Sequence, residues 1–283
     1  MTLTTIGSTD PSSYPDPAPS VARMLYDRVA ATPQGEAFRF PAGAGWASVT
    51  WAQTMETVKT LAAGLLALGI QPEQRVAIAS NTRIEWLYAD LAVMCAGAAT
   101  TAVYPTTAVD DVAFILFDSD TRIVFAEDDA QIAKLRAQRE HLPDLVRVIT
   151  FDGETDGDWV LGMADLEALG ARYLADHRWS VDDAVAAVRP DHLATLIYTS
   201  GTTGRPKGVE LPHRCWTYLG AGAQAIEILR PDDLQYLWLP LSHSFGKMLA
   251  AVQLQIGFPT AIDGRVDKIV DNLAVVRLSL IHI

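Results

Sequence analysis

The sequence predicts an α/β fold in which parallel sheets are covered by helices on both faces. Short continuous runs of Val, Ile and Ala, such as those at 75–80 and 99–103, alternate along the chain with helical patterns. Continuous apolar runs are typical of strands that are buried on both faces of a parallel sheet. Strands that alternate with helices define the α/β class, here in its doubly wound form.

The first elements are predicted from local signals. Ser20 is placed to cap a helix over 21–31, and a Pro-Ala-Gly-Ala-Gly turn predicts a hairpin at 36–49. Thr50 and Gln53 have the spacing of a capping box, and apolar residues at helical spacing follow them. The chain therefore opens with a helix, a hairpin and a second helix.

The remaining elements alternate. Further strands are expected at 122–126, 146–151 and 193–198, beside the two runs named above. Helices are expected at 82–95 (with its own cap), 110–117 and 128–140, and a charged, surface helical region at 161–175.

Composition limits the class of protein. The chain has 283 residues, of which 49% are hydrophobic and 20% charged, so it can build a sizeable core and is not mainly disordered. With 34 acidic and 22 basic residues, the formal net charge is −12. Such a surface repels phosphate backbones, which argues against a nucleic-acid binder. A local anion site is still allowed, because backbone amides hold phosphate without a net positive charge.

The cysteines and the chain ends indicate a cytoplasmic protein. Cys95 and Cys215 are far apart and outside any CxxC pattern, which fits a reducing compartment. Residues 1–19 lack the pattern of a signal peptide and are expected to form a flexible leader. The apolar runs are too short to span a bilayer, while contact with a membrane surface and the oligomeric state stay open.

The segment that follows the expected strand at 193–198 carries the chemistry. Its glycines let the backbone take positive φ and approach a ligand closely. Its hydroxyls and its single ammonium are the donors with which a loop after a strand holds a polyphosphate. These residues are Thr199, Ser200, Gly201, Thr202, Thr203, Gly204, Lys207 and Gly208.

Two common phosphate-binding motifs are excluded. A Walker A loop needs Gly-Lys-Ser/Thr, whereas Lys207 precedes a glycine and Pro206 interrupts the expected helix start. The GxGxxG dinucleotide pattern is absent as well.

The string TSGTTGRPKG at 199–208 resembles the signature loop of the adenylate-forming (AMP-binding) superfamily. That superfamily contains acyl-CoA synthetases, firefly luciferase and the adenylation domains of peptide synthetases. The resemblance extends from about Leu25 to Arg277 and includes CAGAATTAVYP at 95–105 and WLPLSH at 238–243. It is greatest to the N-terminal part of bacterial long-chain fatty acyl-CoA synthetases.

The resemblance implies an ATP-dependent ligase. A fatty acid carboxylate would attack the α-phosphorus of Mg-ATP to give acyl-adenylate and pyrophosphate, and the thiol of coenzyme A would then displace AMP. Thr199 matches the residue that helps to hold the magnesium ion or the adjacent phosphate. The segment from Ser200 to Gly204 and Lys207 match the part of the loop that surrounds the β- and γ-phosphates.

Three further residues are considered through the same resemblance. His243 matches the motif histidine beside the acyl pocket and the adenylate. Lys247, four residues later, would either attract an anionic head group or face solvent. His213 is expected to be structural, as a cap of the next helix.

Several regions of the superfamily have no counterpart in the sequence. They are the stretches that resemble YGxTE and TGD, the hinge, and the C-terminal domain with the catalytic lysine. Residues 20–277 are therefore expected to form an incomplete large domain that is inactive alone, and 278–283 a non-native tail. An adenylating enzyme for an aryl or amino acid and a non-catalytic nucleotide-binding remnant stay open as alternatives.

Overall fold

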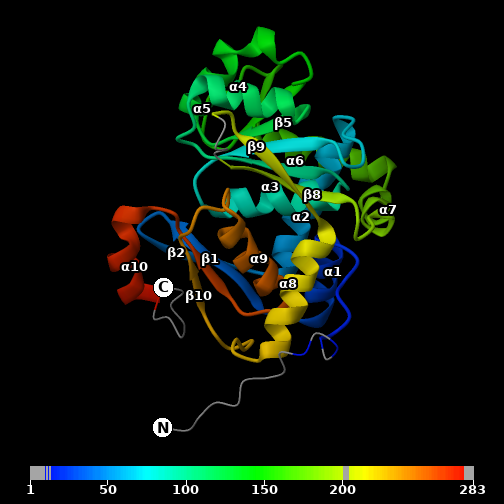
Figure 1. Ribbon diagram of the computed structural model, residues 1–283, viewed down its shortest axis with the longest axis vertical. Coiled ribbons are helices and arrows are strands. Elements are labelled where there is room, and N and C mark those ends of the chain that lie inside the picture. Colours follow the sequence, from blue (N-terminus) through cyan, green and yellow to red (C-terminus); the bar gives the residue numbers. More distant parts are fainter. Residues whose placement is uncertain (1–9, 11, 13, 200–203, 277–283) are drawn as a thin grey trace.

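The computed structural model describes residues 10, 12, 14–199 and 204–276, and its elements confirm the α/β class (Figure 1). Within these residues the strands form a seven-stranded sheet and a four-stranded sheet.

The larger sheet contains the alternating strands that the sequence predicts. In spatial order its strands are β7 (Val160–Gly162), β6 (Arg147–Thr150), β5 (Thr121–Ala126), β3 (Arg75–Ala79), β4 (Ala99–Val103), β8 (Leu193–Thr199) and β9 (Lys207–Pro212). Neighbouring strands are parallel except at β8 and β9, which form an antiparallel hairpin at one edge. Every residue of β4 is buried, which explains why the strand has no alternating polar pattern.

Helices cover both faces of this sheet. The larger core packs one face against helices that include α1 (Val21–Ala31), α2 (Trp51–Ala67), α3 (Ile84–Cys95), α6 (Met163–Asp176) and α7 (Ser180–Ala187). The other face packs against α4 (Val109–Asp118) and α5 (Asp129–Ala137). Along β3, Val76 and Ile78 belong to the first core, while Ala77 and Ala79 belong to the second, as the period of two in a strand requires.

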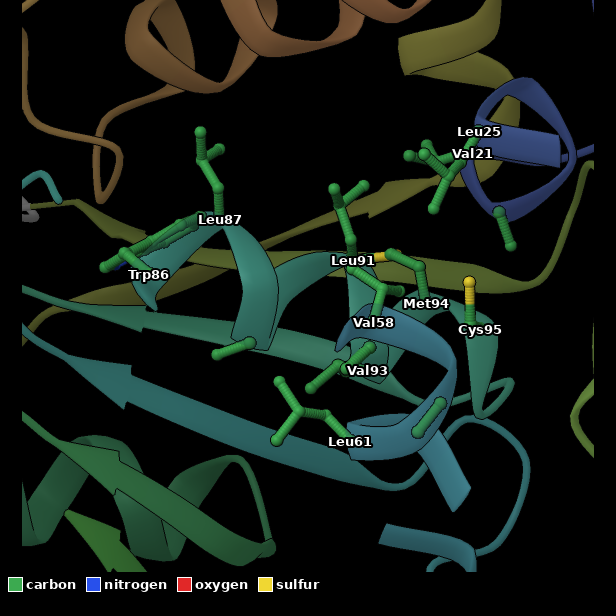
Figure 2. Close-up of a cluster of buried hydrophobic side chains, with 14 of the residues drawn as sticks. Val21, Leu25, Val58, Leu61, Trp86, Leu87, Leu91, Val93, Met94 and Cys95 are labelled. Carbon is green, nitrogen blue, oxygen red and sulfur yellow. The ribbon is translucent and has the colours of Figure 1, made fainter. Parts of the chain in front are cut away.

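Helix α3 lies at the centre of the larger core. All but two of its residues, Glu85 and Tyr88, are buried. Figure 2 shows Leu87 and Leu91 on one side of α3, and Val93 beside Leu61 of α2. A helix that is apolar nearly all round is explained by this position between neighbouring elements.

The smaller sheet joins the two ends of the chain. Its order is β10 (Gln235–Leu237), β11 (Thr260–Ile262), β1 (Glu36–Ala42) and β2 (Gly45–Thr50). The predicted hairpin is confirmed as β1 and β2, and β1 pairs in parallel with the late strand β11. The helices that follow the β8–β9 hairpin are α8 (His213–Ile226), α9 (Ser244–Ile256) and α10 (Ile269–Val276), and short 3-10 turns lie at Arg139–His141 and Val266–Lys268.

Of the three helix caps predicted in the first hundred residues, two are confirmed and one is wrong. Ser20 accepts a hydrogen bond from the amide of Arg23, and Thr50 and Gln53 form the capping box. The predicted helix at 82–95 begins at Ile84 instead, and it has no side-chain cap. The hydroxyl of Thr82 donates to the carbonyl of Leu239 at 2.7 Å, so this side chain binds a distant turn.

The predicted surface helix at 161–175 is shifted. Its first residues belong to the edge strand β7, and α6 begins at Met163. The helix also packs closely on α2, with Leu166 and Gly170 buried. Small residues allow that contact, which the charged character of the segment does not predict.

Candidate active site

The predicted phosphate loop connects the two strands of the β8–β9 hairpin. Thr199, the last residue of β8, lies opposite Lys207, the first residue of β9, and both side chains are exposed. Gly204 has a φ of +97°, so the positive φ that the loop was predicted to need is present at this glycine. Four of the predicted loop residues lie outside the described residues: Ser200, Gly201, Thr202 and Thr203.

The hairpin places a hydroxyl and an ammonium at the carboxyl end of a parallel strand. In open α/β sheets ligands bind outside the carboxyl ends of the strands, where helix N-termini and loop amides gather. Thr199 and Lys207 thus stand at the edge of the sheet where an anion is expected. The arrangement is suited to holding a polyphosphate through the ammonium, the hydroxyl and the loop backbone.

The turn that carries His243 is attached to the same edge of the sheet. The hydroxyl of Ser242 donates to the carbonyl of Val103, the last residue of β4, at 3.2 Å. The amide of Leu241 donates to the hydroxyl of Thr82 at 3.1 Å. Because β4 is the direct neighbour of β8, these bonds bring the turn and the hairpin to adjacent strand ends.

A glycine permits the tight return from this turn into α9. A Cβ added to Gly246 would lie 2.4 Å from the carbonyl oxygen of Pro240, closer than any real contact allows. The turn before α9 therefore requires the absence of a side chain at this position. Gly246 lies three residues after His243, just beyond the WLPLSH motif at 238–243.

His243 caps α9 with its own ring. Its Nδ1 accepts a hydrogen bond from the amide of Phe245 at 3.2 Å, and the residue is exposed. Because Nδ1 is the acceptor, the neutral ring carries its proton on Nε2. The imidazole can therefore donate a hydrogen bond from Nε2 to a ligand that lies outside the helix N-terminus.

Lys247 lies one turn further along α9 and points into the protein. The residue is only 3% exposed, so the alternative in which it faces solvent is wrong. The ammonium forms an ion pair with Asp90 of α3. Both residues line a cavity of about 20 Å³, whose other walls are mostly apolar and include Leu87 and Trp216.

His213 is structural, as predicted, although it does not cap the helix. It is the first residue of α8 and is buried, and its Nδ1 accepts a hydrogen bond from the amide of Val21 at 3.2 Å. Burial, with a smaller effect from the charge of Lys247, lowers the pKa of His213 to about 3. The ring is thus neutral and joins the start of α8 to the start of α1.

Two residues of this region, Asp90 and Thr82, were not selected from the sequence, although the sequence around each of them indicates a special role. Asp90 is an acidic residue among mostly apolar residues of α3, and a buried carboxylate needs a partner. Thr82 follows the end of β3, where parallel strands present their side chains to a site. Neither position indicates which residue is contacted, because the partners, Leu239 and Lys247, come from the distant segment around α9.

The side chains near the site show what kind of metal binding is possible. Within the described residues, no group of three or more His, Cys, Asp and Glu could hold a metal ion. Mg²⁺ in nucleotide sites commonly takes one or two protein oxygens, with phosphates and water as the other ligands. The exposed hydroxyl of Thr199 fits that more limited role.

The sequence and the fold together identify the family. The AMP-binding enzyme family matches residues 25–277, so the chain belongs to this family of adenylate-forming enzymes. The long-chain-fatty-acid–CoA ligase FadD15 of Mycobacterium tuberculosis is 29% identical over 269 residues, which cover 93% of this chain and 43% of that protein. The chain thus spans less than half the length of this relative.

Solved structures show the same fold. A long-chain-fatty-acid–CoA ligase (FadD1) from Archaeoglobus fulgidus superposes with a TM-score of 0.78 at 20% identity, over 94% of this chain and 51% of that one. The N-terminal domain of FACL13 from Mycobacterium tuberculosis superposes with a TM-score of 0.70 at 22% identity, over 92% of this chain and 62% of that one. These matches confirm the architecture expected from the sequence, that of an acyl-CoA synthetase N-terminal domain. Among the helices that the structure describes, none has the length and apolar character needed to cross a membrane.

Proposed function

We propose that this chain is the phosphate-binding part of an ATP-dependent acid–thiol ligase that acts on a fatty acid. The observation that supports the proposal is the pairing of Thr199 with Lys207 at the carboxyl end of β8, next to the turn that carries His243. The long-chain fatty acid ligases among the relatives favour a fatty acid as the substrate. The activity belongs to a protein that also contains the regions which the relatives have beyond the matched 43%.

The proposed reaction has two steps. The fatty acid carboxylate attacks the α-phosphorus of ATP and pyrophosphate leaves, and the thiol of coenzyme A then attacks the acyl carbon and AMP leaves. Lys207 holds the β- and γ-phosphates, so its charge opposes the charge that develops on the departing pyrophosphate. The hydroxyl of Thr199 would hold a magnesium ion, which supplies further electrostatic stabilisation when it is bound with the nucleotide.

His243 and Lys247 take different parts in the proposed acyl site. His243 donates from Nε2 to the acyl-adenylate outside the N-terminus of α9. Lys247 contributes as part of a cavity wall, because its ammonium is already paired with Asp90. We therefore expect the pocket to have no net charge at Lys247, because the carboxylate of Asp90 balances the ammonium.

We also propose a division of the chain. A leader at 1–19 precedes the domain at 20–277, and 278–283 form a non-native tail. Ser20 caps the first helix, in agreement with the start of this domain. The two free cysteines support the cytosol as the place of the protein.

Phosphate binding is tested on the purified chain. Calorimetric titration with Mg·ATP and with Mg·tripolyphosphate is expected to show binding of both, because the hairpin recognises phosphates. Lys207→Ala is expected to weaken both. Lys268→Ala removes the same charge next to the smaller sheet and is the matched control. Equal affinities of the Lys207→Ala variant and the unaltered chain would refute the proposed site.

The reaction and its substrate need a second experiment. The whole open reading frame that contains this chain is expressed, and acyl-adenylate formation is followed by hydroxamate trapping with palmitate, benzoate and amino acids. A product with palmitate supports the proposal, whereas one with benzoate or an amino acid supports an adenylating enzyme for another carboxylate. Nucleotide binding without any product would identify a non-catalytic nucleotide-binding protein. The chain of 283 residues alone is expected to show no fatty-acid-dependent pyrophosphate exchange.

A further inference from the structure

Helix α4 contacts the β8–β9 hairpin near both ends of the connection between its strands. Before the connection, the hydroxyl of Tyr198 donates to Oδ2 of Asp118 at 2.7 Å. Near the far end of the connection, two residues before β9, the guanidinium carbon of Arg205 lies 5.2 Å from the centroid of the Phe114 ring. Figure 1 shows α4 beyond the ends of β8 and β9, at the top of the view.

The two contacts come from one face of α4. Phe114 and Asp118 are four residues apart, so their side chains lie one above the other on the helix surface. The rings of Phe114 and Tyr198 both pack against the second core, which makes the helix a fixed support. The hydroxyl and the guanidinium are the parts of the hairpin that reach back to that support.

These contacts hold residues that are close in the chain to the proposed phosphate-binding residues. Tyr198 immediately precedes Thr199, and Arg205 is two residues before Lys207. A side chain that becomes ordered when its ligand binds loses conformational entropy, whereas one whose neighbours in the chain are already held loses less. Contacts at both ends therefore favour binding without touching the ligand.

We propose that Phe114 and Asp118 of α4 are positioning residues for the phosphate site, acting through Arg205 and Tyr198. Phe114 fixes the guanidinium by a cation–π contact, and Asp118 fixes the phenol by a hydrogen bond. The inference rests on the proposed phosphate-binding function and adds to it the helix that orders the site. The ligand class is the Mg²⁺ complex of a polyphosphate.

The central variant is Phe114→Leu, which keeps an apolar side chain and removes the π face. It is expected to raise the dissociation constant for Mg·tripolyphosphate by about 2- to 5-fold, the range of an exposed cation–π contact. Phe114→Tyr retains the π face and is expected to keep the original affinity. Phe117→Leu is the matched control, since Phe117 lies on the same helix, is 62% exposed, and makes no cation–π contact with the hairpin among the described residues.

The second contact is tested with Tyr198→Phe, which removes only the hydroxyl. The dissociation constant is expected to rise by about 2- to 10-fold, the range of one net hydrogen bond. Arg205→Gln removes a positive charge near the phosphates, and this loss of charge is by itself expected to weaken binding. For this reason the Phe114→Leu and Arg205→Gln changes are combined in a double-mutant cycle, in which Phe114→Leu should have little further effect once Arg205 is absent.

The possible outcomes distinguish the phosphate-binding function from the positioning role of α4. Binding by the unaltered chain, weakened by Phe114→Leu and Tyr198→Phe but not by Phe117→Leu, supports the proposal. Unchanged dissociation constants for both variants overturn it, even if their melting temperatures fall, because the contacts are then only structural. An unaltered chain that binds neither Mg·tripolyphosphate nor Mg·ATP refutes the proposed function itself, and the positioning role with it.

Discussion

The ammonium of Lys247 lies 2.7 Å from Oδ1 of Asp90, and solvent reaches neither side chain appreciably. The hydroxyl of Thr100 donates to the same oxygen at 2.6 Å. The rings of Trp86 and Trp216 flank the ammonium, with their centroids 5.9 and 5.7 Å from Nζ. Burial lowers the pKa of Lys247, and the charge of Asp90 opposes that effect. The pair thus joins α3 to the first turn of α9, beside the residue expected to contact the adenylate.

Removing one member of this pair should be more harmful than removing both. Lys247→Met leaves Asp90 as an uncompensated buried charge, and we expect the free energy of unfolding to fall by about 3–5 kcal/mol. The double variant Asp90→Leu/Lys247→Met should lose much less, since no charge remains in the core. Urea unfolding followed by tryptophan fluorescence measures both values.

The ion pair between Lys59 and Asp182 is the control for this comparison. Its charged atoms are 2.8 Å apart, close to the 2.7 Å of the buried pair, but its side chains are 30% and 26% exposed. Lys59→Met should therefore lower the free energy of unfolding by only about 1 kcal/mol or less. Equal losses for Lys59→Met and Lys247→Met would show that burial does not set the strength of the Asp90 contact.

His213 should make the stability of the fold depend on pH. Burial lowers its pKa to about 3 in the native state, whereas an unfolded histidine titrates near 6.5. The unfolded state therefore binds one more proton between these values, so stability rises with pH through this window and is lost as the pH falls. The slope should approach about 1.4 kcal/mol per pH unit near pH 5.

The variant His213→Gln tests this prediction, because an amide does not titrate and its oxygen can accept from Val21. Unfolding is measured from pH 5 to 6.5, above the range in which carboxylates such as Asp263, whose pKa is lowered, contribute. A slope that persists in His213→Gln would assign the pH dependence to another group.

Gly246 should not tolerate even a methyl group. Its Cβ would meet the carbonyl oxygen of Pro240 at 2.4 Å, so Gly246→Ala must displace the turn that carries His243. We expect a loss of about 1–3 kcal/mol in the free energy of unfolding, as for other overpacked sites. Gly45→Ala is the control, since no atom lies within 4 Å of a Cβ there, and calorimetric unfolding compares the two. A smaller loss for Gly246→Ala than for Gly45→Ala would contradict the close approach.

The five inner strands of the larger sheet, from β6 to β8, could be predicted from sequence because they are continuous apolar runs between helices, whereas the short strand β7 and the exposed strand β9 at its two edges were not predicted. The smaller sheet could be predicted only at its hairpin. Strands β10 and β11 have three residues each, too few for a period to be recognised, and their partner β1 lies at the other end of the chain. Pairing between distant segments depends on how the layers pack, which a local pattern does not contain.

The candidate site divides in the same way. The order of residues at 199–208 was sufficient to identify the family, because few structural needs would produce that order, and the strand before it was recognisable as an apolar run. The environment of Lys247 was not predictable, since its partner Asp90 is 157 residues away. The contacts of α4 with Tyr198 and Arg205 were hidden for the same reason, because no spacing in the sequence relates Asp118 to Tyr198.

The two cysteines should differ sharply in reactivity. Cys95 is the last residue of α3 and is completely buried, and burial raises the pKa of its thiol to about 12. Cys215 is only half-buried in α8. The thiolate is the reactive form, so a disulfide reagent at pH 8 should modify Cys215 in the native chain and reach Cys95 only after denaturation. Cys215→Ser should abolish the reaction of the native chain without changing the reaction of Cys95 after denaturation. Two thiols that react rapidly in the native chain would mean that the end of α3 opens to solvent, and a helix that opens in this way could not hold Asp90 against Lys247.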